Sequence, residues 1–162
     1  SELISDDREK ALLFNENLAK VYRYILCNRS ADLVTVKEEV DFLNSYVLLL
    51  KIRFENALDI NTKIGAIDLS RYYLPTIAIQ TAIENAIKHN QFSDSNPLSI
   101  SIELTNDYAI IANNKNLARY KTISPGVGLT NLDNRYKLIL NKSIHIDETS
   151  GSFTIYLPVV KK

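Results

Sequence analysis

The chain has 162 residues, of which 46% are hydrophobic and 23% charged, so it can bury a core of its own. Its 19 basic residues balance 19 acidic ones, which argues against a nucleic-acid binder or a polybasic membrane binder. A single cysteine, Cys27, excludes an internal disulfide and a cysteine-built metal cage, and fits a reducing compartment. The sequence contains no methionine and begins with Ser1, so we expect a piece of a longer protein.

Two helices are predicted in the first 56 residues. Apolar residues recur at helical spacing from Asp7 to about Cys27, and after a polar break at 28–33 a second helix begins at Thr35, where Glu38 completes a capping box. The second helix carries an apolar seam with steps of four and three residues: Val36, Val40, Leu43, Val47, Leu50 and Phe54. The spacing leaves open whether these helices cover a core or form a hairpin that dimerises.

The remaining residues alternate between strand and helix patterns. A third helix, with Pro75 near its first turn, is expected to run to about Asn90. The other elements are strands at 58–64, 98–104 and 108–112, a fourth helix at about 129–140, and strands at 143–147 and 153–159. This order predicts an α+β fold with a largely antiparallel sheet, in which a helical region at 1–56 precedes a domain at 57–162.

The third helix is the segment richest in chemistry. A polar stripe crosses its apolar surface, and Thr81, Asn85, Lys88 and His89 lie within an arc of about 100°. The amide oxygen of Asn85 suits Mg²⁺ bound to phosphates, Lys88 suits a phosphate, and His89 suits a base or ribose. Spacing alone favours a plainer alternative, a solvated face on which Glu84 and Lys88 form an i,i+4 pair.

Two glycines, Gly126 and Gly128, stand directly before the fourth helix. Closely spaced glycines let backbone N–H groups approach phosphate oxygens, and the helix N-terminus adds positive potential, although a simple Pro-Gly turn is the alternative. The preceding loop, 115–125, carries three cations that either favour an anion or are solvated. Together with the polar stripe, this segment indicates a nucleotide cleft covered by a loop.

Residues 84–89, Glu-Asn-Ala-Ile-Lys-His, resemble the N box of the GHKL (Bergerat-fold) ATPases in the form found in LytS-type sensor histidine kinases. Six further segments resemble that family in the same order, so that the likeness covers nearly the whole chain: 22–26, 34–39, 51–54, 126–132, 135–136 and 153–158. The resemblance implies a Bergerat-type α/β sandwich, with a mixed, largely antiparallel sheet and helices on one face, preceded by a helical hairpin.

The resemblance also implies cofactors and site residues. Asn85 would bind Mg²⁺, with Lys88 and His89 contacting ATP after it, and Glu84 and Lys88 are the candidates for catalysis. The glycine box beside the lid at 115–125 would contain Gly126 and Gly128, and Gly151 would lie in a turn near the adenine. Asn113 stands where the family has an Asp that accepts a hydrogen bond from the adenine amino group, and Lys115 stands where it has a glycine. Asn113 can still accept that hydrogen bond but lacks the charge-assisted strength of Asp, so the affinity for the nucleotide is the property that these departures affect.

The activity implied is that of a protein histidine kinase, which moves the ATP γ-phosphoryl to a His and then to a response regulator. The chain has only His89, in the N box, and His145, in a late strand, so we expect the phosphoacceptor upstream of this sequence. One alternative is a pseudokinase or dimerisation module with a decayed nucleotide pocket. The other is an ATPase, which is disfavoured because Thr81 occupies the position of the hydrolytic Glu.

The resemblance implies partners and a location as well. We expect a homodimer through the N-terminal helices, a response regulator as partner and no nucleic acid. A membrane would be reached only through a region outside this sequence. The chain is thus expected to be the cytoplasmic portion of an inner-membrane-anchored protein.

Overall fold

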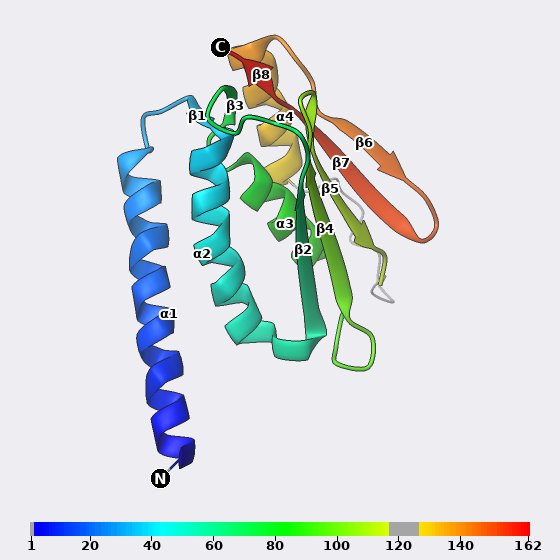
Figure 1. Cartoon of the computed structure of the whole chain (residues 1–162). Helices are drawn as coiled ribbons and strands as arrows, with labels where there is room; N and C mark the ends of the chain where they lie inside the picture. The colour runs from blue at the N-terminus through cyan, green and yellow to red at the C-terminus, as the bar shows by residue number, and fades with distance from the viewer. Residues whose placement is uncertain (1, 117–126) are drawn as a thin grey trace.

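The structure is a computed structural model that describes residues 2–116 and 127–162, with side chains from residue 7 onward (Figure 1). The elements in chain order are α1 (Glu2–Cys27), β1 (Leu33–Thr35), α2 (Val36–Phe54), a 3₁₀ turn η1 (Glu55–Ala57), β2 (Leu58–Ile64), β3 (Tyr72–Pro75), α3 (Ala78–His89), β4 (Leu98–Leu104), β5 (Tyr108–Asn114), α4 (Val127–Leu140), β6 (His145–Glu148), β7 (Ser152–Pro158) and β8 (Val160–Lys161). The predicted α+β class is confirmed.

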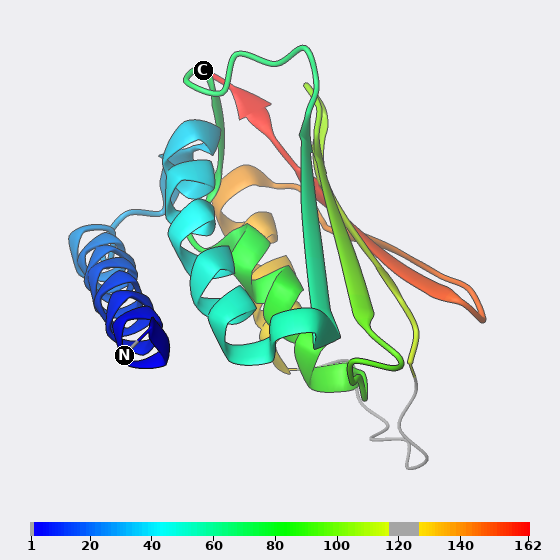
Figure 2. The same cartoon turned by 60° about the horizontal axis from the view of Figure 1, so that its bottom comes forward.

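The main sheet has five strands in the order β2-β4-β5-β7-β6. β2 pairs with β4 in parallel, and the other neighbours are antiparallel, as the sequence predicted for a mixed, largely antiparallel sheet. A parallel pair needs a crossover, and α3 lies in the chain between β2 and β4. Figure 2 shows α2, α3 and α4 on one face of this sheet, while the described segments leave the other face uncovered.

A second, small sheet was missed by the sequence analysis. β1, β3 and β8 form it in the order β1-β3-β8, with antiparallel pairing that places Leu33 opposite Pro75. Pro75 therefore ends a strand, and its predicted place in the first turn of the third helix is wrong. Strands of two to four residues show too little alternation to be seen, and their partners lie far apart in the sequence.

The predicted start of α2 is confirmed. The backbone N–H of Glu38 donates to Thr35 Oγ1 at 3.1 Å, and the N–H of Thr35 donates to Glu38 Oε2 at 2.7 Å, which completes the capping box. Four residues of the α2 seam, Val36, Val40, Leu43 and Leu50, belong to the same buried core as the sheet and α3. These residues thus cover a core, which was one of the two alternatives left open.

α1 lies at the outer edge of the molecule and packs on α2 (Figures 1 and 2). Val21 is buried, and the rings of Tyr24 and Phe42 stack at 4.4 Å between centroids. The face of α1 away from α2 exposes Leu12, Tyr22 and Leu26, each more than 60% accessible. No helix in the described part of the chain is long and apolar enough to cross a membrane.

Candidate functional site

The site is built around α3, which packs against α2, α4 and the strands β4, β5 and β7. Its Ala and Ile residues form a continuous buried side: Ala78, Ile79, Ala82, Ile83 and Ala86. The helix ends at Asn90, whose side-chain Nδ2 donates to the carbonyl of Ala86 at 2.8 Å. Burial of one side turns the polar residues of the stripe toward the edge of the helix layer.

The C-terminal half of α3 carries polar groups without internal partners. Asn85 is half-buried and Lys88 is exposed, and neither side chain makes a hydrogen bond or ion pair with the described residues. The Nε2 atom of His89 is buried, again with no hydrogen-bond partner in the described part of the chain. Buried polar atoms are nearly always paired, so His89 Nε2 is an atom that a ligand could satisfy. Gln80 Oε1 and Tyr136 Oη are likewise buried without a partner among the described residues.

Glu84 faces α2. Its Oε1 accepts hydrogen bonds from Gln80 Nε2 at 2.7 Å and from Tyr46 Oη at 3.3 Å. Burial, together with the neighbouring Glu84 charge, raises the pKa of Tyr46 above its usual value. Among the ion pairs of residues 7–116 and 127–162 there is none between Glu84 and Lys88, so the alternative that paired these two side chains is not what the structure adopts.

The end of β5 lies next to the end of α3. Asn113 is 5% exposed and shares the helix-facing side of β5 with Ala109 and Ile111. Its Nδ2 donates to the carbonyl of Asn114 at 2.7 Å, which orients the amide and leaves Oδ1 as an acceptor. Asn116 ties the strand exit to the helix, because its N–H donates to Asn90 Oδ1 at 2.8 Å and its carbonyl accepts from the N–H of Gln91 at 2.8 Å.

The other residues predicted for the site are spread over two neighbouring segments. Gly128, in the first turn of α4, lies beside the stripe: a Cβ added there would stand 3.7 Å from Thr81 Cγ2. Gly151 lies in the exposed β6–β7 turn, where its carbonyl accepts from the N–H of Lys115 at 3.0 Å and an added Cβ would meet nothing within 4 Å. Gly126 and positions 117–125 of the predicted lid lie outside the described residues.

Lys115 links the exit of β5 to the same turn. Its Nζ lies 2.6 Å from Glu148 Oε1 and donates to the carbonyl of Thr149 at 3.0 Å. The side chain is 13% exposed, whereas that of Glu148 is 56% exposed. The lysine that stands in place of the family's glycine thus ties the exit of β5 to the β6–β7 turn of the same sheet.

A buried carboxylate that the sequence analysis did not identify lies at the other end of α3. Glu39 of α2 is fully buried, and its Oε2 accepts from Tyr24 Oη at 2.8 Å and from the N–H of Ile77 at 3.1 Å. Its Oε1 accepts from the N–H of Ile79 at 3.2 Å. Burial raises the pKa of Glu39, although these hydrogen bonds and Arg135 act in the opposite direction. The sequence feature that could have identified Glu39 is its place on the apolar seam of α2, between Val36 and Val40.

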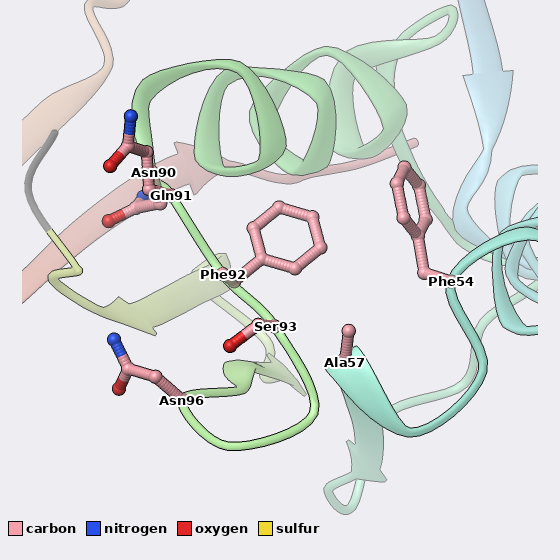
Figure 3. Close-up of a pocket in the computed structure, with 7 residues that line it drawn as sticks. All are labelled: Phe54, Ala57, Asn90, Gln91, Phe92, Ser93 and Asn96. Carbon is pink, nitrogen blue, oxygen red and sulfur yellow. The ribbon is translucent and has the colours of Figure 1, made fainter.

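A separate hollow opens beyond the C-terminal end of α3 (Figure 3). Its volume is about 630 Å³, and it is lined by Phe54, Ala57, Asn90, Gln91, Phe92, Ser93 and Asn96. The rings of Phe54 and Phe92 meet edge to face at 5.2 Å between centroids. None of the residues predicted for the nucleotide site lines this hollow.

Comparisons with known proteins give a consistent result. Residues 1–58 match the family described as histidine kinase. Sensor histidine kinase BtsS of Escherichia coli K12 is 29% identical over 139 residues, which are 83% of this chain and 24% of that protein. Sensor protein kinase HptS of Staphylococcus aureus is 30% identical over 90 residues, or 56% of this chain and 17% of that protein. The chain spans about a quarter of the length of the first of these relatives.

Solved structures of low sequence identity share the fold. The catalytic domain of histidine kinase ThkA superposes with a TM-score of 0.50 at 14% identity, covering 80% of this chain and 97% of that one. The cytoplasmic segment of histidine kinase QseC gives a TM-score of 0.51 at 12% identity, covering 96% and 95% of the two chains.

Proposed function

Since the chain is a homologue of the sensor histidine kinases and has the fold of their catalytic domains, we propose that it is the ATP-binding core of a two-component kinase. The family and fold predicted from the sequence are confirmed. The core would transfer the ATP γ-phosphoryl to a His upstream of this sequence, and from there to a response regulator.

One observation carries this proposal. On the C-terminal half of α3, the side chains of Asn85 and Lys88 and the Nε2 of His89 lack partners among the described residues, and this half adjoins the strand end that buries Asn113. We assign Asn85 Oδ1 to Mg²⁺, Lys88 to a phosphate and His89 Nε2 to the nucleotide. Mg²⁺, when bound, would neutralise charge on the phosphates.

The base of the nucleotide is assigned to the end of β5. Asn113 would use Oδ1 to accept from the adenine amino group, because its Nδ2 is engaged by the carbonyl of Asn114. Gly126 and Gly128 are proposed to approach the phosphates, and Gly151 to lie near the base, as the family pattern implies. ATP and Mg²⁺ are therefore the proposed substrate and cofactor.

Glu84 is proposed as the catalytic carboxylate. Both hydrogen bonds to it reach Oε1, so Oε2 is the oxygen that can accept a proton. Lys88 follows Glu84 by four residues on the same helix. Its proposed role is to neutralise the charge that develops on the transferred γ-phosphoryl group. Phosphoryl transfer depends mainly on such positioning and charge neutralisation.

The two alternative functions have less support. Thr81 stands where a hydrolytic ATPase carries its Glu, and its hydroxyl donates to the carbonyl of Ile77 at 2.8 Å, so it offers no base for water. The other alternative, a pseudokinase with a decayed nucleotide pocket, rests on the departures at Asn113 and Lys115. However, Asn113 keeps an oriented acceptor, and Lys115 is engaged by Glu148 and Thr149.

The proposed partners are a second copy of the chain and a response regulator. The exposed face of α1 carries apolar residues at steps of seven, three and four: Leu12, Ala19, Tyr22 and Leu26. Such spacing is typical of a helix that packs against a parallel or antiparallel copy. We propose dimerisation through this face, in the cytoplasm, with any membrane anchor outside this sequence.

The test of the function uses a longer protein that includes the upstream His, beside residues 1–162 alone. With γ-labelled ATP and Mg²⁺, the longer protein should acquire acid-labile, base-stable label, and residues 1–162 should not, because neither His89 nor His145 lies on the N-terminal helices. Label of that kind on residues 1–162 would overturn the assignment of the acceptor. No label on either protein would overturn the kinase function.

A further inference from the structure

We propose that Glu39 is a positioning residue that couples α1 to the helix carrying the nucleotide ligands. Its two carboxylate oxygens connect the hydroxyl of Tyr24 on α1 to the first backbone N–H groups of α3. This inference rests on the proposed roles of Asn85 and Lys88, which lie on the same helix.

The start of α3 takes its hydrogen-bond acceptor from another helix. The first N–H groups of a helix have no partner within the helix and need an acceptor. Ile77 and Ile79 find it in Glu39, at 3.1 and 3.2 Å, rather than in a side chain next to them in the sequence. Ile77 itself has φ of 62°, a left-handed conformation that is rare for a β-branched residue, so its backbone is held by its surroundings.

Other elements also fix the turn that precedes α3. Thr76 Oγ1 donates to the carbonyl of Ala31 at 2.8 Å, in the connection between α1 and β1. The carbonyl of Thr76 accepts from Arg135 of α4 at 3.0 Å. The start of α3 is therefore held from α1, α2 and α4 together, with Glu39 fully buried between them.

α3 can carry a shift of its first turn to the proposed ligands. α3 spans only 12 residues, so a shift of its first turn moves Asn85 and Lys88 with it as one rigid element. α1 contacts these hydrogen bonds through the hydroxyl of Tyr24, which donates to Glu39. A movement of α1 that withdraws Tyr24 from Glu39 would change the support of the helix and hence the position of the proposed ligands.

The test compares Tyr24→Phe with Tyr108→Phe, which makes the same change at an exposed position of β5. Two quantities are measured on the full chain: amide hydrogen exchange at Ile77 and Ile79 by NMR, and the Mg²⁺-dependent dissociation constant for ADP by calorimetry. We expect Tyr24→Phe to speed exchange at both amides and to weaken Mg·ADP binding about fivefold, the equivalent of one hydrogen bond. Tyr108→Phe should change neither quantity.

A stability control separates positioning from loss of folding. Ile60→Val removes a buried methyl group from β2 and should lower the melting temperature without weakening Mg·ADP binding. Glu39→Gln should weaken binding more than Tyr24→Phe, because an amide N–H₂ would then face a backbone N–H donor.

The outcomes distinguish the inference from the proposed function. If the wild type binds Mg·ADP and Tyr24→Phe binds it equally well, Glu39 is not a positioning residue, whatever happens to exchange. Unchanged exchange at Ile77 and Ile79 in Tyr24→Phe would also overturn the coupling. If the wild type shows no Mg²⁺-dependent binding, the proposed function fails first, and the positioning of its ligands by Glu39 fails with it.

Discussion

The two ends of α3 differ in how their polar groups are satisfied. At the N-terminal end, Ile77 and Ile79 donate to the buried Glu39. In the C-terminal half, the side chains of Asn85 and Lys88 and the Nε2 of His89 have no partner within the described segments. The backbone at the N-terminal end, the fixed end, is thus held by the fold, although the buried Gln80 Oε1 in the first turn is also unpaired among the described residues. The C-terminal half, the open end, presents three side chains without partners there. The contrast indicates which end is structural and which end is available to a ligand.

Removing the Glu39 carboxylate at the N-terminal, fixed end of α3 should have the largest effect on stability. Glu39→Ala leaves three donors, those of Tyr24, Ile77 and Ile79, without their acceptor, and each unpaired buried group costs about 1–3 kcal/mol. We expect the free energy of unfolding, measured in urea, to fall by about 3–5 kcal/mol. The control is Glu84→Ala on the exposed side of α3, which should cost less than about 1 kcal/mol. Equal losses in the two variants would contradict the contrast.

At the C-terminal, open end of α3, the assignment of the base to Asn113 predicts that the chain prefers ATP to GTP. Asn113 Oδ1 can accept from the amino group of adenine but faces a carbonyl oxygen in guanine, so ATP should bind more tightly than GTP. Asn113→Ala should remove most of this preference, reducing ATP affinity by about tenfold and leaving GTP affinity nearly unchanged. Dissociation constants for the two nucleotides, measured with excess Mg²⁺, give the ratio. A ratio that Asn113→Ala does not alter would place the base elsewhere.

The fixed end should also show a pH signature. Burial holds the pKa of Glu39 above its ordinary value of 4.5, so the folded protein binds this proton more tightly than the unfolded chain does. The stability that this group contributes is fully present below pH 4.5 and is lost as the pH rises through the folded pKa. The stability of the wild type relative to Glu39→Gln should therefore fall as the pH increases above 4.5, as urea unfolding at several pH values would measure. A gap between the two proteins that widens over that range would show that the hydrogen bonds outweigh burial.

The smallest effect is expected at Lys115, beside the open end. Its partner Glu148 is 56% exposed, so Lys115→Ala should lower the free energy of unfolding by about 1 kcal/mol or less. Because Lys115 is engaged with the β6–β7 turn, nucleotide affinity should change by less than about twofold, which is within about 0.4 kcal/mol. A marked gain in affinity would mean that the lysine obstructs the pocket.

The long, strongly periodic elements could be predicted from the sequence. The capping box at Thr35, the strand at 58–64 and the apolar side of α3 all reflect local spacing, and each is present in the structure, although the inward-facing alternation of the strand stops after Ile60. The short strands β1, β3 and β8 could not be predicted, since pairing between distant segments defines them. This is why Pro75 was assigned to a helix when it ends a strand.

The site was predictable in its residue types but not in its contacts. Sequence spacing predicted Lys88 as the partner of Glu84. The donors to Glu84 are instead Gln80, on the same helix, and Tyr46, which lies 38 residues away on α2. The acid at Glu39 was visible on an apolar seam, but its role depends on α3 reaching it from 38 residues further along the chain. Such contacts are fixed by tertiary packing, which no local pattern records.

The central claim, that the C-terminal half of α3 binds Mg·nucleotide, is tested most directly by an NMR titration of the ¹⁵N-labelled chain with ADP, with and without Mg²⁺. The wild type should show Mg²⁺-dependent shifts at Asn85, Lys88, His89 and Asn113, none of which lines the hollow beyond α3. Asn85→Ala should lose the Mg²⁺-dependent part, whereas Asn44→Ala, an exposed change on α2, should keep it. Shifts confined to the hollow between Phe54 and Phe92, or an equal response to Mg²⁺ in Asn85→Ala and the wild type, would contradict the claim.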